Sequence, residues 1–211
     1  MSLRIALARG APFAPVLELL AAAGFPVDPL RGDSRKLIFE LEDGSTVFTV
    51  RPTDVPVYVE FGAADVGFAG KDVLAEQSRD IYELLDLHLA PCRLVYASPR
   101  KATERRADRL GRLRIATKYP NIARKYFEGT GRHVEAVPLH GSIELAPLVG
   151  LADGIVDIVS TGATMHANGL VEREQIMECS QRLVANRAAH KLHSAEIGAL
   201  SESLRAQVEE R

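Results

Sequence analysis

Short apolar runs alternate along the chain with segments whose apolar residues recur at helical spacing. The apolar runs predict strands near 3–7, 36–42, 46–51, 65–69, 93–98, 113–117, 134–139 and 155–159. The helical patterns between them predict helices at 13–23, 52–61, 71–78, 120–128, 142–149 and 163–168. Because strands that alternate with helices build βαβ units, we expect an α/β fold with mostly parallel sheets and flanking helices.

Two local patterns add detail to this outline. The dipeptide Asp43-Gly44 separates two strand patterns, 37–42 and 46–51, and is a typical hairpin turn. Near the end of the chain, residues 194–210 form an amphipathic helical pattern. Its apolar stripe consists of Ile197, Leu200, Leu204 and Val208.

The strand pattern 155–159 ends in a loop rich in small polar residues. In open α/β sheets ligands bind beyond the carboxyl ends of strands, and this end leads into Ser160, Thr161, Gly162, Ala163 and Thr164. Gly162 lets the backbone approach a ligand closely, and the start of the next helix attracts a phosphate. The alternative is an ordinary capping turn. The loop has no lysine, so it is not a Walker loop for a nucleoside triphosphate.

Two acidic residues lie near this loop in the sequence. Asp157 interrupts the apolar run, and a charge there must be paired, hydrated or functional. It is either a ligand contact or a cap at the strand end. Glu144 is either a ligand contact or an acid in the first helical turn after Ser142, where the helix dipole favours it. Asp153 is expected to be a turn residue before the strand.

The order and spacing of these residues resemble the signature of the ATP phosphoribosyltransferase family. The matching positions are Glu144, Gly150, Ile155, Asp157, Thr161, Gly162, Thr164 and Met165. The resemblance continues through residues 50–74, 114–127 and 166–170, and so covers most of the chain. The length is similar to that of the short form, which lacks the carboxy-terminal regulatory domain of the long form.

An internal echo indicates two similar halves. The same pattern occurs from residues 62–66 to 68–72 and from 150–153 to 161–164. In each half a helix ends at a glycine, an apolar strand follows, and a glycine-containing loop precedes the next helix. The resemblance implies a type II periplasmic-binding-protein-like fold with the active site in an interlobe cleft. We expect lobe I at 1–90 plus 180–211 and lobe II at 91–179, with crossings near Ala90-Pro91-Cys92 and Cys179-Ser180.

The resemblance implies a reaction in which N1 of ATP attacks the anomeric carbon of phosphoribosyl pyrophosphate. Pyrophosphate leaves together with Mg²⁺, and the product, N1-(5-phospho-β-D-ribosyl)-ATP, is the first intermediate of histidine biosynthesis. The ribosyl centre becomes cation-like and the leaving group is anionic, so the site needs carboxylates and cations. Residues 160–164 are expected to hold the 5-phosphate, and Asp157 or Glu144 to accept hydrogen bonds from ribose hydroxyls. Asp157 and Arg51 are the expected catalytic residues.

Four cations follow strand patterns and are candidates for binding ATP: Arg9, Arg51, Lys71 and Lys118. Arg51 is the first choice, because Pro52 suits the first position of a helix and would point the arginine at the cleft. The alternatives are an ion pair of Arg51 with Asp54 or Glu42, and a place for Lys71 at a helix start. The family usually has Lys-Gly-Arg after the first strand, whereas Ala8-Arg9-Gly10-Ala11 keeps only the cation before the glycine.

Composition narrows the class of protein. The 211 residues are 46% hydrophobic, enough for a core, and the net charge is 26 − 28 = −2, with no basic stripe for nucleic acid. The densest basic cluster, 100–114, is expected to be a solvated face. The chain begins with an apolar strand pattern and not with the long hydrophobic region of a secretory signal, and no run reaches the length of a membrane span, so we expect a cytoplasmic protein. No pair of histidines has zincin spacing on one helix, so we expect no structural transition-metal site. Cys92 and Cys179 lack metal-ligand spacing and are expected to act as small apolar residues in a reducing compartment.

The resemblance also implies partners. Short-form enzymes act as a homodimer within a hetero-octamer, together with a regulatory subunit similar to histidyl-tRNA synthetase. The alternative function is a non-catalytic two-lobed binding module of the same fold. Such a module would not need Asp157 and Glu144 beside a phosphate loop.

Overall fold

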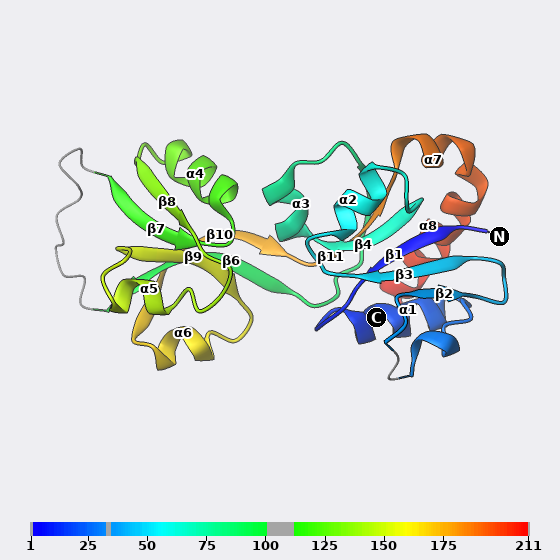
Figure 1. The fold of residues 1–211 in the computed structure, drawn as a ribbon, viewed down its shortest axis with the longest axis horizontal. Coiled ribbons are helices and arrows are strands. Elements are labelled where there is room, and N and C mark those ends of the chain that lie inside the picture. The colour runs from blue at the N-terminus through cyan, green and yellow to red at the C-terminus, as the bar shows by residue number, and fades with distance from the viewer. Residues whose placement is uncertain (1, 33–34, 101–111, 211) are drawn as a thin grey trace. The chain divides into compact units, whose positions relative to one another are not determined.

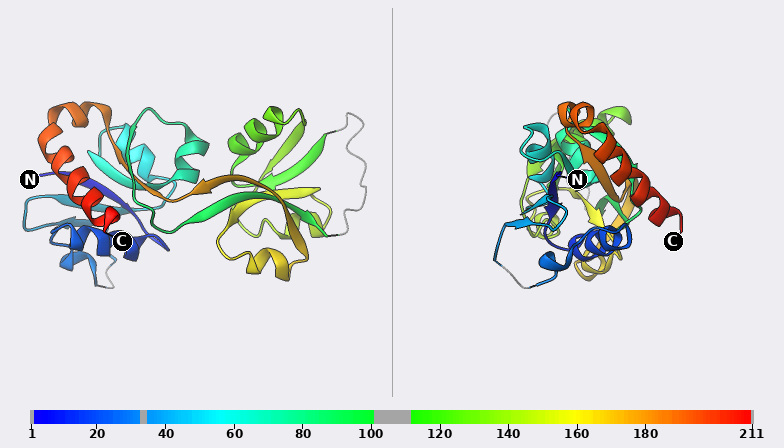
Figure 2. Two further views of the ribbon diagram at one scale, coloured as in Figure 1. Left: turned by 180° about the vertical axis from the view of Figure 1, so that it is seen from behind. Right: turned by 90° about the vertical axis from the view of Figure 1, so that its right-hand side faces the viewer.

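The computed structural model describes residues 2–32, 35–100 and 112–210. The chain forms two compact units, drawn in Figure 1 and from two further sides in Figure 2. Unit 1 consists of Met1–Ala90 and Ser180–Arg211, and unit 2 consists of Pro91–Cys179. The chain therefore passes from one unit to the other at the two points expected from the sequence. Of the basic cluster 100–114, residues 101–111 lie outside the described residues.

Unit 1 is built on a six-stranded sheet in the order β2-β3-β1-β4-β11-β5. The strands are β1 (Arg4–Ala8), β2 (Ile38–Glu40), β3 (Thr46–Val50), β4 (Val66–Gly70), β5 (Tyr82–Asp86) and β11 (Gln181–Ala185). The helices are α1 (Phe13–Ala22), the 3-10 helix η1 (Asp28–Leu30), α2 (Val55–Glu60), α3 (Lys71–Gln77), α7 (Arg187–Leu192) and α8 (Ser194–Glu209). The central strands β3, β1 and β4 are parallel.

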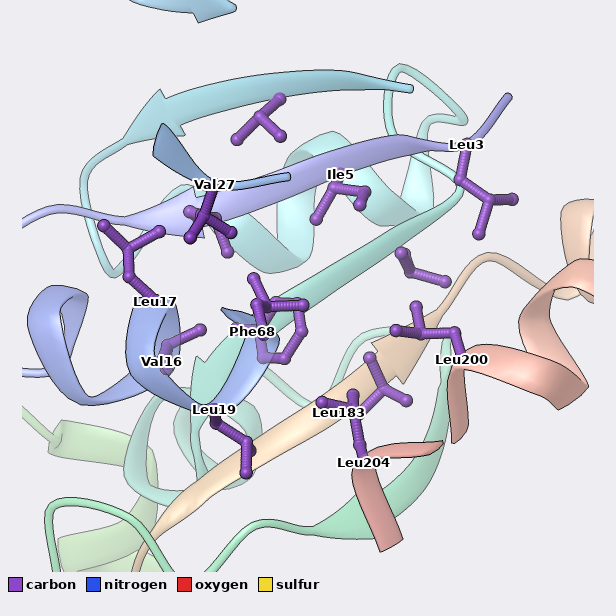
Figure 3. Packing of buried hydrophobic residues seen from close by; sticks show 14 of the residues in the cluster. Leu3, Ile5, Val16, Leu17, Leu19, Val27, Phe68, Leu183, Leu200 and Leu204 are labelled. Atoms are coloured by element: carbon purple, nitrogen blue, oxygen red, sulfur yellow. The ribbon is translucent and has the colours of Figure 1, made fainter. Parts of the chain in front are cut away.

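Both faces of this sheet are covered, which explains the continuous apolar run in β1. On one face, Ile5 packs with Phe68 of β4 and with leucines of α1 and α8, as Figure 3 shows. On the other face, Ala6 packs with Val55 and Val59 of α2. A methyl group on Gly67 of β4 would lie 2.7 Å from Val55 Cγ1, so only glycine allows α2 to pack this closely.

Unit 2 is built on a five-stranded sheet in the order β10-β6-β9-β7-β8. The strands are β6 (Cys92–Pro99), β7 (Leu113–Thr117), β8 (Val134–Pro138), β9 (Gly154–Val159) and β10 (Leu170–Cys179). Its helices are α4 (Pro120–Gly129), α5 (Leu145–Leu148) and α6 (Ala163–Ala167). The core on one side of the sheet joins Val95 of β6, Ile155 of β9 and Met165 of α6.

Each expected strand has a counterpart, and the hairpin and the last helix are confirmed. Strands β2 and β3 pair antiparallel around Asp43-Gly44, and α8 buries Ile197, Leu200 and Leu204. The expectation of mostly parallel sheets is wrong in detail. Among the pairings of the described residues, four are parallel and five are antiparallel. Three of the antiparallel pairings come from strands that the sequence analysis missed, β5, β10 and β11.

The missed elements have weak periodic patterns for identifiable reasons. Strand β10 is interrupted by register shifts between Glu172 and Glu174 and between Gln175 and Met177, so its side chains do not alternate regularly. Helix α7 is only six residues long. Its one clear signal is the Asn186 side chain, which caps the helix by accepting from two backbone amides at 2.9 Å.

The internal echo reappears as a repeated set of contacts. In unit 1, the Asp65 carboxylate accepts from the Arg4 backbone N–H at 2.8 Å, and Asp65 N–H donates to the Arg4 carbonyl at 2.8 Å. In unit 2, Asp153 and Arg114 make the same two bonds, at 2.8 and 2.7 Å. Asp153 is therefore a turn residue that fixes the start of β9 against β7, as expected.

Candidate active site

A pocket of about 270 Å³ lies in unit 2 at the carboxyl end of β9. Its lining consists of Val95, Glu144, Ile155, Asp157, Ile158, Val159, Ser160, Thr161, Gly162, Ala163, Thr164 and Met165. The structure thus brings together both candidate carboxylates and the whole of the predicted phosphate loop. They meet because α5, β9 and α6 pack around one core that includes Ala146, Ile155 and Met165.

The loop takes its shape from one glycine. Gly162 has φ +80 and precedes α6, a backbone conformation that glycine adopts without steric cost. The Thr161 hydroxyl accepts from Ala163 N–H at 3.4 Å, and the Gly162 carbonyl accepts from His166 N–H at 3.0 Å. The amide of Thr164 belongs to the first turn of α6, where N–H groups have no acceptor within the helix. Such amides suit an anionic ligand.

Asp157 is half-buried in β9 and faces this pocket. Burial raises the pKa of its carboxyl group, the backbone N–H of Ile158 and the charge of Lys118 lower it, and the nearby Glu144 raises it. Its Oδ1 accepts from Ile158 N–H at 2.9 Å. That bond to the next residue of the same strand is not a helix cap. Lys118 and Glu144 are thus near enough for their charges to influence the Asp157 carboxyl group.

The structure places Glu144 at the pocket and not in the first turn of a helix, which was the alternative. Helix α5 covers only Leu145–Leu148, shorter than the expected 142–149, and Glu144 is its N-cap residue and not part of the first turn. Its side chain makes no capping hydrogen bond. Ser142 has φ +47, which breaks the helical path before Glu144. The half-buried Glu144 side chain lies along the pocket wall.

Three of the four candidate cations lie at one edge of the sheet in unit 1. Arg9, Arg51 and Lys71 directly follow β1, β3 and β4, which are adjacent parallel strands, so all three emerge at the carboxyl edge. The guanidinium of Arg9 donates to the Lys36 carbonyl at 2.7 Å. Lys71 forms an ion pair with Glu83 of β5 at 2.6 Å.

Arg51 is exposed and, among the described residues, has no ion-pair partner. The expectation that Pro52 begins a helix is wrong, because residues 52–54 form a turn and α2 starts at Val55. The turn is closed by a bond of 2.9 Å from Asp54 N–H to the Arg51 carbonyl.

Two residues beside the pocket were missed from the sequence. The buried Thr117 at the end of β7 donates its hydroxyl to the Val156 carbonyl at 2.6 Å and accepts from Tyr119 N–H at 2.8 Å. It fixes the turn that carries Lys118. Arg93 reaches the Ser160 carbonyl at 3.5 Å while it is paired with Glu172 of β10 at 2.7 Å. A polar residue at the end of a buried strand was the only available signal for Thr117.

The described residues contain no cluster of three or more His, Cys, Asp or Glu side chains that could hold a metal ion. Within the same residues, no helix is both long and apolar enough to cross a membrane.

The chain is similar to known proteins in both sequence and fold. Residues 51–206 match the family described as HisG: ATP phosphoribosyltransferase. An ATP phosphoribosyltransferase of Rubrobacter xylanophilus is 48% identical over 96% of this chain and 94% of its own length. One of Syntrophotalea carbinolica is 53% identical over 88% of this chain and 86% of its own length. The chain therefore matches relatives of similar, short length.

Solved structures show the same fold. A structure titled ATP phosphoribosyl transferase (HisG:HisZ) complex from Thermotoga maritima superimposes with a TM-score of 0.83. It is 33% identical and covers 99% of this chain and 100% of that chain. The alkanesulfonate-binding protein SsuA from Xanthomonas axonopodis pv. citri has a TM-score of 0.60 at 14% identity, covering 98% of this chain and 72% of its own. The second likeness supports the periplasmic-binding-protein-like architecture alone.

The relatives from Rubrobacter xylanophilus, Syntrophotalea carbinolica and Thermotoga maritima are all named as phosphoribosyltransferases, which favours the catalytic function over the binding-module alternative. From its matched residues, its pocket and its fold, the chain belongs to the ATP phosphoribosyltransferase family.

Proposed function

We propose that the pocket of unit 2 binds phosphoribosyl pyrophosphate and that the chain transfers its 5-phosphoribosyl group to N1 of ATP. In this reaction the bond from the anomeric carbon to the pyrophosphate oxygen breaks, and a bond from that carbon to the adenine nitrogen forms. The observation that carries the proposal is the joint lining of one pocket by Asp157, Glu144 and the loop 160–164. A monoester phosphate needs several N–H and O–H donors, which this loop offers.

Asp157 is proposed to hold the ribose and to stabilise the reacting carbon. In the transition state the ribosyl centre gains positive charge, and a fixed carboxylate nearby lowers its energy. The raised pKa of Asp157 reflects burial, and the positive charge that develops on the ribosyl centre would favour its ionised form. Glu144, from a separate element, is proposed to accept from the second ribose hydroxyl.

The cations are proposed to bind the phosphates of ATP and the leaving pyrophosphate. Arg9, Arg51 and Lys71 emerge from one sheet edge, and Lys118 lies in the electrostatic environment of Asp157. Arg51 is the best candidate for a direct contact, because its guanidinium is exposed and suits a bidentate phosphate contact. Lys71 can bind a phosphate only after its ion pair with Glu83 is broken.

Magnesium is proposed to enter with the substrate. Mg²⁺ commonly binds through substrate phosphates with only one or two protein carboxylates. It neutralises charge on the departing pyrophosphate. This mode of binding needs no cluster of protein ligands.

We further propose a cytoplasmic enzyme that works with a regulatory partner. The Thermotoga maritima relative is titled as a HisG:HisZ complex. By analogy, this chain is expected to form a homodimer within a hetero-octamer that contains a subunit similar to histidyl-tRNA synthetase.

The direct test mixes the protein with ATP, phosphoribosyl pyrophosphate and Mg²⁺ and follows pyrophosphate release and the ultraviolet change of N1-substituted adenine. Turnover is expected with all three, and none when either substrate or the metal is omitted. The assay is repeated with the HisZ-type subunit present. A chain that binds phosphoribosyl pyrophosphate but gives no product under either condition contradicts the catalytic proposal.

A further inference from the structure

The two cysteines of the chain lie opposite each other in one sheet. They are separated by 179 − 92 = 87 positions in the sequence. In the structure Cys92 is the first residue of β6, Cys179 is the last residue of β10, and the two are register partners in the antiparallel pair of these strands. Figure 2 shows the two strands side by side. They lie at the two ends of unit 2, Cys92 as its second residue and Cys179 as its last.

This placement has the geometry that a disulfide needs. Residues directly opposite each other in an antiparallel pair have Cα atoms roughly 4.5–5.5 Å apart and side chains on the same face. Disulfides span Cα separations of about 4.4–6.8 Å. Both residues are thiols in this structure. The Cα separation typical of such a register pair therefore lies within the range that a disulfide spans.

The surrounding backbone holds the pair in register. On the side of unit 2, the ladder continues from Glu178 opposite Arg93 along β10 and β6. On the side of unit 1, Gln181 N–H donates to the Leu89 carbonyl at 3.0 Å, and the Gln181 carbonyl accepts from Leu87 N–H at 3.0 Å. Because both flanks are hydrogen-bonded, the two cysteines are kept opposite each other.

The solvent exposure of the two cysteines determines which one reacts first with an oxidant. Cys179 is 4% exposed, whereas Cys92 is only half-buried, so a dissolved oxidant reaches Cys92 first. Reactive cysteines are thiolates with access to solvent, and a second cysteine nearby can resolve the first product.

We propose that Cys92 and Cys179 form an oxidation site that takes an intramolecular disulfide from a small-molecule disulfide such as oxidised glutathione. The Cys92 thiolate attacks one sulfur of the oxidant and releases one thiol. The Cys179 thiolate then attacks the Cys92 sulfur of the mixed disulfide and releases the second thiol. Two cysteine thiols are oxidised, one oxidant disulfide is reduced, and the two protons end on the released thiols.

The bond makes the stability of unit 2 depend on redox state. It closes a loop from Cys92 to Cys179, which is all of unit 2 except Pro91. Cross-linking the ends of a long segment restricts the unfolded chain, and so stabilises the folded unit. The inference concerns the ends of unit 2 and stands or falls independently of the proposed reaction.

The experiment titrates the full-length protein with mixtures of reduced and oxidised glutathione and then blocks remaining thiols by alkylation. The expected product has lost two hydrogen atoms, accepts no alkyl group, and yields one proteolytic peptide that links positions 92 and 179. Its melting temperature is expected to rise by roughly 5 °C or more over the reduced protein. Cys92→Ser and Cys179→Ser are matched controls. Each retains one cysteine, and neither should show the cross-linked peptide or the oxidation-dependent rise.

Three outcomes would overturn the proposal. One is stable glutathione adducts on the wild-type protein without loss of two hydrogen atoms. Another is cross-links between chains on a non-reducing gel in place of the internal bond. The third is that oxidised glutathione alone does not oxidise the two thiols in the folded protein, although it oxidises them in the urea-unfolded chain. All three are measured on the wild-type protein, so the test does not depend on the folding of the variants.

Discussion

The loop that is proposed to hold the phosphate depends on Gly162, and its replacement by alanine gives a quantitative test. Gly162 has φ +80, where a residue with a Cβ atom costs about 1–2 kcal/mol. The added Cβ would lie 3.4 Å from Cδ2 and Nε2 of the His166 ring and 3.7 Å from Val159 Cγ1. These are ordinary van der Waals contacts, which leave room for the added methyl group. The cost therefore comes chiefly from the backbone.

The backbone has two responses, and each has a separate readout. If the loop keeps its conformation, the free energy of unfolding falls by about 1–2 kcal/mol. If the loop relaxes away from positive φ, its amides turn from the ligand. The loss of one hydrogen bond to a charged group costs about 1.5–3 kcal/mol, which raises KM for phosphoribosyl pyrophosphate roughly tenfold to hundredfold. The KM for ATP should change little.

Gly131→Ala is the matched control. Gly131 follows α4 in the same unit, has φ +73, and has no atom within 4 Å of an added Cβ. The Gly131→Ala protein should lose a similar amount of stability, and its KM for phosphoribosyl pyrophosphate should not change. The assays are urea unfolding and initial rates of pyrophosphate release with either substrate varied. An equal rise of KM for phosphoribosyl pyrophosphate in both variants would refute the assignment of the loop, as would a Gly162→Ala protein in which neither this KM nor the free energy of unfolding changes.

Three more changes follow from contacts in unit 2. Asp157→Asn should lower kcat/KM by a factor equivalent to ~1–3 kcal/mol of transition-state free energy. Steady-state rates equal to wild type would show that Asp157 is not part of the site. Because burial raises the pKa of Asp157, the native state binds this proton more tightly than the unfolded chain. The stability that this proton provides is present below the unfolded pKa and is lost as pH rises through the raised pKa. Asp157→Asn should therefore unfold at a higher urea concentration than wild type at neutral pH. Thr117→Val removes the hydroxyl that bonds the Val156 carbonyl, and should cost about 1–3 kcal/mol in urea unfolding, with an unchanged midpoint as the contrary result. The Arg132 guanidinium lowers the pKa of Glu174, so their ion pair stabilises above the unfolded pKa and is lost as pH falls through the lowered one. Glu174→Gln should cost about 1 kcal/mol at pH 7 after allowance for solvent screening, and the difference should vanish in acid; a constant difference across pH would contradict this ion-pair account.

Local patterns in the sequence determined much of the fold. The strand 155–159 and the loop after it were predicted because an apolar run and a Ser/Thr/Gly turn are encoded by neighbouring residues. The hairpin around Asp43-Gly44 was predicted for the same reason. Asp157 and the loop 160–164 meet in the pocket because the end of β9 and the start of α6 are adjacent in the chain, whereas Glu144 joins them only because α5 packs on the same core.

Contacts between distant residues were decided only by the tertiary structure. Cys92 and Cys179 were read as unrelated apolar residues, and only the pairing of β6 with β10 places them opposite each other. Lys71 was read as a cation for ATP, and only the position of β5 supplies Glu83 as its partner.

The same limit applies to the chemistry of the site. The sequence identified Asp157 as a charge within an apolar run, because hydropathy is a property of each residue and its neighbours. The pKa of Asp157 depends on burial in the assembled sheet, which raises it, and on Lys118 and Glu144 from other parts of the chain, which lower and raise it respectively. Periodicity reports which face of an element is apolar, whereas pairing, register and electrostatics arise only when separate elements pack together.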